Sequence, residues 1–387
     1  MNAQPLQPYD PAGAVAQAMD AEGLRLLLRL PEIVFQPAVL VTVFRVEGST
    51  PRSVGARMVV REGRLIAGTI GGGHLEQQAM ADCGSFASGH AQALDAEDPR
   101  IGPAESRGDV REQANAQGEI AQLRRYPLGP QLAQCCGGVA WLHFRGLDRP
   151  AALQLAHATQ QAQSHGHYLE TSFGDEQLRE RPQPLPTVLI CGAGHVAAAL
   201  SRVLQPLPWR VLVVDSRPEW AETFRFPSGT EVVCTEPLRL LAAWGWLGET
   251  ARLSRAAVRL QEHGRPLPLV PVPSYTYALV MTHDHALDRD LTEALLRVGN
   301  GAASVGEPEG NLAYVGLIGS RSKIAATRQR LRRRGVDPHL LDRLVAPIGL
   351  QHEGRLLGGK LPGEIAISVA AQLLTLQAPT STLRASE

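Results

Sequence analysis

The sequence predicts an α/β protein, with a mixed α/β N-terminal domain followed by a Rossmann-like domain built on a doubly wound parallel sheet. A short apolar strand at 187–191 runs into the glycine turn Gly192-Ala193-Gly194, and a second apolar strand, 210–215, ends in Asp215. This succession of strand, glycine turn, helix, strand and carboxylate is typical of nucleotide-binding βαβ units. The proline-rich stretch 176–187 separates the two domains, and we expect it to be a stiff linker that can hold neither a helix nor a central strand.

The length of the chain also favours two domains, because 387 residues exceed one ordinary domain. We expect the first domain at 1–175, the linker at 176–187 and the Rossmann-like domain at 188–387. Within the first domain, 95–120 is rich in small and polar residues without periodicity, which predicts a mobile surface insertion.

Composition excludes several classes of partner. The 38 basic and 38 acidic side chains leave no net field to attract nucleic acid or an anionic membrane. No apolar stretch approaches the roughly 20 residues that a membrane span needs, and the N-terminus lacks a secretory signal. Five cysteines, an odd number, do not form a disulfide framework in so long a chain. We therefore expect a soluble, cytoplasmic protein with neither nucleic acid nor membrane as a partner.

The N-terminal domain contains a glycine turn that could bind an anion. Strands are predicted at 38–46, 56–60 and 65–68, and the run Gly71-Gly72-Gly73-His74 with Glu76 then opens a helix. Backbone N–H groups left free by such a turn can hold a phosphate, with His74 and Glu76 orienting the ligand. The alternative is a tight turn whose histidine and glutamate are merely solvated.

Cys135 and Cys136 stand together before two glycines, at the entrance of a predicted strand at 139–144. A thiolate is a soft ligand and a nucleophile, so the pair could hold a sulfur-containing cofactor or lie near a soft metal. The alternative is that the thiols fill core volume.

The C-terminal glycine turn carries the main site prediction. Gly192 permits the sharp turn, Gly194 permits close approach of a diphosphate, and Asp215 stands where ribose hydroxyls are bound. His195 adds an imidazole, and Ala197 replaces the third glycine of the fingerprint. The ligand could be a dinucleotide such as NAD(P) or a phosphate-bearing pterin.

A strand at 275–282 delivers His283, Asp284, His285 and Asp288 to the same edge of the sheet. The histidines and Asp288 could ligate a metal and support a hydrolase. The alternative, which we favour, is that Asp284 or Asp288 caps the following helix.

The strand at 313–318 ends in a third candidate anion site. It is followed by Gly319, Ser320 and Lys323 and then by a strongly basic helix. The early N–H groups of this helix and Lys323 could neutralise a phosphate, with Ser320 as a cap. The later arginines are expected to form a solvated face.

Six motifs in this order resemble the XdhC/CoxI family over nearly the whole chain. They are Gly48-Ser49-Thr50-Pro51-Arg52 with Gly55-Ala56, Gly68 through Glu76, Leu128 through Gly138, Gly192 through Val196, Met281 through His285, and Gly316 through Ser320. The resemblance implies a chaperone that binds the molybdenum cofactor, a molybdopterin. It would shelter the cofactor while a cysteine desulfurase supplies sulfur, and deliver it to the molybdenum-binding subunit of xanthine dehydrogenase. It also implies that the chain is not an enzyme.

The segments 95–120 and 351–357 depart from the family pattern, so the sequence does not determine the surfaces that dock partners. It also leaves undecided whether the chain forms a homo-oligomer. We expect the glycine turns and the thiol pair to converge on one cavity. An NAD(P)-binding oxidoreductase is the alternative function.

Overall fold

The computed structural model describes residues 15–87, 110–114, 120–128, 137–247, 273, 275–298, 311–353 and 355–376. The chain divides between Gln183 and Pro184 into two compact units, unit 1 and unit 2. Each unit has its own sheets and its own hydrophobic cores.

The described residues of unit 1 form two sheets. The larger is antiparallel, with the order β4-β3-β2-β7-β6-β5. Its strands are β2 (Ala38–Glu47), β3 (Arg57–Arg61), β4 (Arg64–Gly68), β5 (Val110–Ala114), β6 (Ile120–Pro127) and β7 (Val139–Leu147). The smaller sheet has the order β1-β9-β8 and comprises β1 (Val15–Ala18), β8 (Leu169–Phe173) and β9 (Glu176–Arg181). The helices described in this unit are α1 (Ala21–Ile33), α2 (Gly73–Ala87) and α3 (Arg149–His165).

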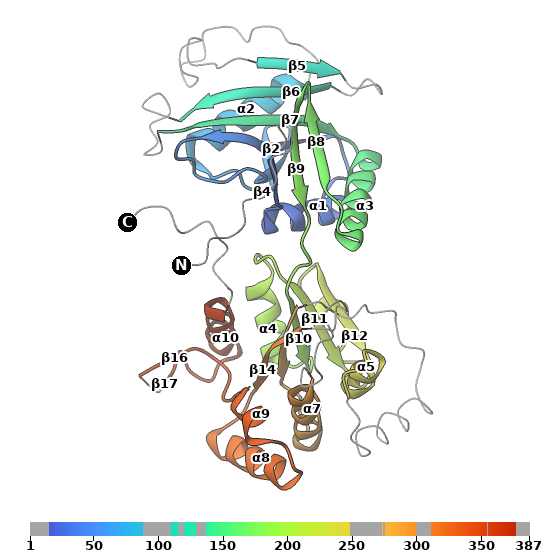
Figure 1. Cartoon of the computed structure of the whole chain (residues 1–387), viewed down its shortest axis with the longest axis vertical. Coiled ribbons are helices and arrows are strands. Elements are labelled where there is room, and N and C mark those ends of the chain that lie inside the picture. Colours follow the sequence, from blue (N-terminus) through green and yellow to red (C-terminus); the bar gives the residue numbers. More distant parts are fainter. Residues whose placement is uncertain are drawn as a thin grey trace. The chain divides into compact units, whose positions relative to one another are not determined.

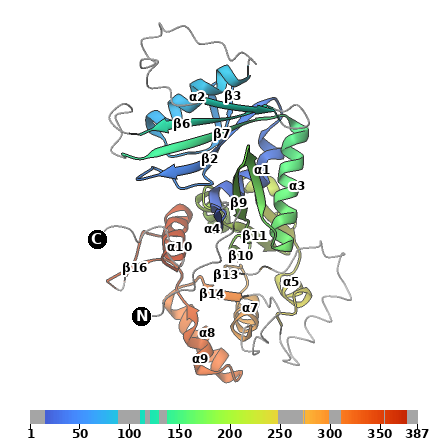
Figure 2. The same ribbon diagram turned by 45° about the horizontal axis from the view of Figure 1, so that its top comes forward.

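The alternation of side chains along β2 separates the two faces of the larger sheet. Val39, Val41 and Val43 share one core with Leu75 and Ala79 of α2. The residues between them point to the opposite face, which is the side of α1 and β9; Figure 2 shows α2 and α1 on opposite sides of this sheet. Residues 38–44 of the apolar run are therefore buried on both faces, as their continuous hydrophobicity predicts, whereas Arg45 is exposed and Val46 half-buried.

The predicted linker is wrong over its first half. Residues 176–181 form β9, the central strand of the smaller sheet, parallel to β1 and antiparallel to β8. The prolines begin only at Pro182, so every residue of β9 keeps its backbone N–H for pairing. Leu178 and Glu180 alternate inward, and the buried Glu180 forms an ion pair with the buried Arg57 of β3.

The predicted insertion at 95–120 is also wrong in part. Residues 110–114 form β5, an edge strand antiparallel to β6, because ladder pairing needs backbone groups rather than an apolar pattern. The ranges 88–109 and 115–119 lie outside the described residues. The segment at 351–357 contains the short hairpin of β16 (Gln351–His352) and β17 (Arg355–Leu356).

Unit 2 confirms the Rossmann prediction. Its parallel sheet has the order β12-β11-β10-β13-β14-β15, which is the doubly wound order 3-2-1-4-5-6. The strands are β10 (Thr187–Cys191), β11 (Arg210–Asp215), β12 (Thr230–Cys234), β13 (Tyr275–Val280), β14 (Asn311–Leu317) and β15 (Leu344–Val345). The helices described here are α4 (His195–Leu204), the 3-10 turn η3 (Thr223–Arg225), α5 (Pro237–Ala243), α7 (His285–Arg297), α8 (Arg321–Arg333), α9 (Pro338–Asp342) and α10 (Pro362–Leu376).

Helices cover both faces of this sheet (Figure 1). The face carrying Val188 and Ile190 packs against α4 and α10, whereas the face carrying Leu189 and Cys191 packs against α5, α7, α8 and α9. The strand order reverses between β10 and β13, which pair directly. A ligand crevice is therefore expected beyond the carboxyl ends of these two strands.

Candidate functional site

The turn from β10 into α4 is shaped for an anion. Gly192 has a φ of 112°, and a Cβ there would overlap the carbonyl oxygen of Met281, so only glycine fits. A Cβ on Gly194 would meet nothing within 4 Å, so the space beside this residue is open. Among the residues that the structure describes, no side chain caps the start of α4. The first N–H groups of this helix are thus available to a phosphate or carboxylate.

Asp215 stabilises this turn from the end of β11. Its buried carboxylate accepts hydrogen bonds from the Ala193 N–H at 2.7 Å and from the Nε and Nη2 atoms of Arg217 at 2.9 and 2.8 Å. Burial raises the pKa of this carboxyl, but the hydrogen bonds from Arg217 and Ala193 outweigh burial, and the pKa lies below its usual value. The carboxylate that the sequence assigned to ribose hydroxyls is therefore already paired.

A cationic and aromatic cluster flanks the turn: Arg217, Trp220 and Arg225, which we name the arginine–tryptophan cluster. The two guanidinium carbons lie 4.7 and 4.4 Å from the centre of the Trp220 ring. Nη1 of Arg225 donates to the Ala193 carbonyl at 3.3 Å, and the exposed His195 ring meets Trp220 edge-on at 5.4 Å. Arg217 is paired with Asp215, and Arg225 adds a further positive charge beside the open helix start.

Sequence reasoning missed this cluster. The available signal was an arginine two residues after the acidic end of the second strand, a position associated with phosphate recognition in dinucleotide folds.

The carboxyl end of β13 supports the capping interpretation. Asp284 caps α7 by accepting from the N–H groups of Ala286 and Leu287, as the favoured alternative predicted. Asp288 is fully buried and accepts from the Thr282 hydroxyl at 2.7 Å and from Nζ of Lys323 at 2.6 Å. His283 and His285 are exposed. Among the described residues there is no group of three or more His, Cys, Asp or Glu side chains placed to hold a metal ion.

The third predicted anion site is partly engaged in structural contacts. Ser320 caps α8 by accepting from the N–H of Lys323 at 3.3 Å, and Gly319 packs against the Lys323 side chain. The Lys323 ammonium pairs with Asp288, so it ties the start of α8 to the end of β13 rather than standing free for a phosphate.

The buried Cys191 thiol at the end of β10 is not suited to act as a soft ligand at neutral pH. Burial raises the pKa of Cys191 to about 12, and the negative charges of Asp288 and Asp215 add to this effect. Cys135 and Cys136 lie outside the described residues. The residues that flank them are placed: the Leu128 N–H donates to the Gly138 carbonyl at 2.8 Å, and the Gly138 N–H donates to the Ser49 carbonyl at 3.0 Å.

The glycine turn of unit 1 does not present the free N–H groups that the sequence predicted. The residues Gly71, Gly72 and Gly73 all have positive φ, but the Glu76 carboxylate fills the turn. It accepts from the N–H groups of Ile70 and Gly72 at 3.2 and 3.0 Å and from the Thr69 hydroxyl at 2.7 Å. The chain therefore supplies its own anion here. His74 is exposed at the first turn of α2.

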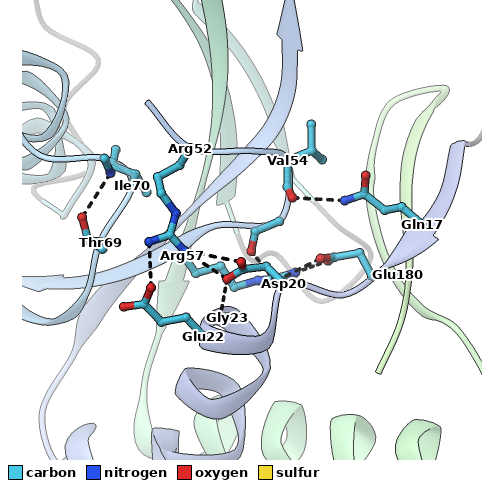
Figure 3. A network of polar contacts seen from close by, with 12 residues as sticks. Gln17, Asp20, Glu22, Gly23, Arg52, Val54, Arg57, Thr69, Ile70 and Glu180 are labelled. Atoms are coloured by element: carbon cyan, nitrogen blue, oxygen red, sulfur yellow. Dashed lines mark hydrogen bonds and ion pairs between the residues drawn. The ribbon is translucent and has the colours of Figure 1, made fainter. Parts of the chain in front are cut away.

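The motif at 48–52 has a structural role (Figure 3). Nη1 of Arg52 donates to Glu22 at 2.7 Å, and Nη2 donates to Asp20, the residue that caps α1, at 3.2 Å. Burial lowers the pKa of Arg52, but its bond to Glu22 and the charge of Asp20 raise it overall. The turn after β2 is thus fixed to the start of α1.

The structure brings together the site residues of unit 2, from Gly192 to Lys323, at the carboxyl edge of one sheet. The turn at 71–76 belongs to unit 1. The single cavity expected to unite all of these turns with the thiols stays a prediction.

Fold and site define this chain as a two-unit α/β protein whose second unit is a Rossmann domain with an anion-binding turn. Residues 188–373 match the XdhC Rossmann domain, and residues 35–95 match the XdhC and CoxI family. The chain belongs to the XdhC and CoxI family.

Two known proteins are similar in sequence to most of this chain. The uncharacterized protein YqeB of Escherichia coli (strain K12) is 24% identical over 341 residues, which are 88% of this chain and 44% of YqeB. The chain thus spans less than half the length of that relative. A probable xanthine dehydrogenase subunit of Bacillus subtilis (strain 168) is 21% identical over 369 residues, covering 88% of this chain and 93% of the relative.

A crystal structure of a xanthine dehydrogenase from Bacillus halodurans has a similar fold. It matches with a TM-score of 0.55 and 21% identity, covering 94% of this chain and 98% of that chain. No helix among the described residues is long and apolar enough to span a bilayer.

Proposed function

We propose that this chain is an accessory protein of xanthine dehydrogenase that binds the molybdenum cofactor at the carboxyl edge of the sheet in unit 2. Family membership and the name of the Bacillus subtilis relative support the accessory role. The observation that carries the cofactor site is the open, uncapped start of α4 beside the arginine–tryptophan cluster.

The residues of this edge fit the phosphate end of a molybdopterin. The space beside Gly194 is open, and the first N–H groups of α4 point into it from a helix of ten residues. Arg225 adds a positive charge, and the guanidinium N–H groups of Arg217 and Arg225 that Asp215 and the backbone carbonyls do not use are directional donors that suit phosphate oxygens. Because Trp220 is flat and already binds two guanidinium groups, it keeps those donors ordered before any ligand arrives.

The chain would act as a carrier in the cytoplasm rather than as an enzyme. A cysteine desulfurase would supply the sulfur ligand while the cofactor is held, and the molybdenum-binding subunit of xanthine dehydrogenase would receive it. Cys135 and Cys136 are proposed to lie near the molybdenum, because thiolates are soft ligands.

The phosphate site is tested with Gly194→Asp. The residue has an ordinary backbone conformation and open space around it, so an aspartate fits, but its carboxylate would cap α4 and occupy the anion site. The matched control is Gly363→Asp, in the first turn of α10, where a Cβ also meets nothing within 4 Å.

The measurement is mass spectrometry and absorbance of the small molecules that copurify with the full chain. We expect a phosphorylated pterin with the unmodified chain and with Gly363→Asp, and at least a tenfold loss with Gly194→Asp. Pterin retained at full stoichiometry by Gly194→Asp would refute the site. A nicotinamide dinucleotide in place of the pterin would favour the alternative, an NAD(P)-binding oxidoreductase.

The thiol pair is tested separately with Cys135→Ser and Cys136→Ser together. We expect bound molybdenum to fall while the pterin phosphate is retained. Unchanged molybdenum in the double variant would remove both thiols from the site.

A further inference from the structure

The carboxylate at the end of β11 is fully occupied by the chain itself. Oδ1 of Asp215 accepts from the backbone N–H and from Nε of Arg217 at 3.0 and 2.9 Å. Oδ2 accepts from the Ala193 N–H at 2.7 Å and from Nη2 of Arg217 at 2.8 Å. These four hydrogen bonds match the roughly four lone pairs that a carboxylate offers. Asp215 is also only 4% exposed, so its acceptor sites are used up before any ligand arrives.

Arg217 is held against Asp215 from several sides. Its side chain makes a bidentate ion pair with the carboxylate, and its guanidinium carbon lies 4.7 Å from the centre of the Trp220 ring. The Arg217 carbonyl accepts from the N–H groups of Trp220 and Ala221 at 3.1 and 3.0 Å, which folds the chain after β11 into a turn. Moving this side chain aside would therefore give up the ion pair and the ring contact together, and would leave a buried carboxylate with fewer donors.

Asp215 stands where dinucleotide-binding folds hold a ribose. It ends the second strand of the parallel sheet, in register with Cys234 of β12, and its bond to Ala193 ties it to the glycine turn. In such folds the carboxylate at this place accepts hydrogen bonds from the ribose. A ribose hydroxyl that met Asp215 in this chain would lose its bonds to water and find the lone pairs already taken, which lowers affinity.

The phosphate half of the same turn is open. A Cβ on Gly194 would meet nothing within 4 Å, and within the described part of the chain α4 starts without a side-chain cap. Unit 2 thus keeps the phosphate subsite of a dinucleotide fold while its ribose subsite is closed. A ligand that fits both observations carries its phosphate on a body other than ribose.

We propose that Arg217 is a specificity-determining residue. By filling the acceptor sites of Asp215 it closes the ribose subsite, so that the site takes a phosphate ester whose body has no ribose at this place. The inference rests on the phosphate site of the proposed function and adds which ligands that site rejects.

The test compares ADP with 2′,3′-dideoxy-ADP, two probes that differ only in the ribose hydroxyls. Arg217→Ala removes the side-chain donors from Asp215 and keeps the backbone N–H. The control, Arg210→Ala, removes an arginine that makes a bidentate pair with Glu231 at 2.6 and 2.7 Å, at the amino end of the same strand. Binding of both probes to the full chain is measured by calorimetry.

We expect Arg217→Ala to bind ADP at least about tenfold more tightly than dideoxy-ADP, because the freed carboxylate can accept from the ribose hydroxyls. The unmodified chain and Arg210→Ala should bind ADP no more tightly than dideoxy-ADP. Should Arg217→Ala fail to fold, Arg217→Met, which keeps an unbranched apolar stem beside Trp220, carries the same expectation.

A preference for ADP in the unmodified chain would overturn the proposal, and so would the lack of that preference in the Arg217 variant. Binding of NADPH at least about tenfold tighter than that of NADH by the unmodified chain would also overturn it, because Arg217 would then serve a ribose phosphate. The proposed function fails separately, since it is refuted when no pterin copurifies, whichever probe the Arg217 variant prefers.

Discussion

Lowering the pH should destabilise unit 1 through His143. Burial and the charges of Arg145 and Arg57 lower the pKa of this histidine from 6.5 to about 4 in the folded protein. Between these two values the unfolded chain binds a proton that the folded chain does not, so the free energy of unfolding rises with pH across this window and falls on acidification. The difference of about two and a half pH units corresponds to about 3 kcal/mol in full, and to about 2 kcal/mol between pH 7 and pH 5.

The assay is urea unfolding of the full chain at pH 7 and pH 5, followed by hydrogen exchange of peptides from β2 and β7. Comparison with His143→Phe isolates the contribution of this one group, because the other titrating groups are common to both proteins. Phenylalanine suits the site, which lies between Phe44 and Phe173. The control, His157→Phe, removes an exposed histidine of α3 and should behave like the unmodified chain.

We expect the unmodified chain to lose about 2 kcal/mol more than His143→Phe on going from pH 7 to pH 5. If the free energies of unfolding of the unmodified chain and of His143→Phe fall by amounts that agree within about 0.5 kcal/mol, the usual limit of additivity, His143 is not the source of the pH dependence.

Three further predictions concern stability. Glu180→Gln should lower the free energy of unfolding of unit 1 by about 3–5 kcal/mol in urea, because it leaves the Arg57 charge buried and unpaired. Glu176→Gln, which breaks partly exposed ion pairs, should lower it by under about 1 kcal/mol, and equal losses for the two variants would contradict the role of burial. Asp284→Ala should lower the free energy of unfolding of unit 2 by about 1 kcal/mol through loss of the α7 cap, and no difference from His283→Ala would count against the cap. Gly192→Ala should lower the free energy of unfolding of unit 2 by at least about 1–3 kcal/mol and lower its melting temperature, whereas Gly194→Ala should have little effect. Similar melting temperatures for the two variants would argue against the close approach of Gly192 to Met281.

The architecture of unit 2 was predictable because each strand is a short apolar run with a distinct signal at its carboxyl end. Gly192, Asp215 and Asp284 stand at those ends, and a parallel sheet places such ends along one edge. The strand β9 was missed because its polar residues and the prolines after it resemble a linker. Its inward residue Glu180 is charged, and its partner Arg57 is 123 positions away, a separation at which local pattern carries no information.

The chemistry of the site was less predictable than its position. Three glycines suggested free N–H groups at 71–73, but Glu76, four residues after Gly72, folds back and accepts from the Gly72 N–H, while the Gly71 N–H donates to the Thr69 hydroxyl. Lys323 suggested a phosphate ligand, but it lies beside the buried Asp288. In both places a carboxylate of the chain itself binds the group that was expected to bind a phosphate, and the spacing of residues in the sequence does not reveal this. The pairing of Arg217 and Arg225 on Trp220 likewise depends on the path of the chain between β11 and β12.

The central position of β9 determines where the chain can be cut. A fragment ending at residue 175, the boundary suggested by the prolines, would remove the only strand that joins β1 to β8 within the described smaller sheet. It would also strip the carboxylate from Arg57 and leave a guanidinium sealed in the interior. A piece of the protein meant to fold by itself should therefore run from before Val15 to beyond Arg181, and the shorter piece should be recovered as an aggregate.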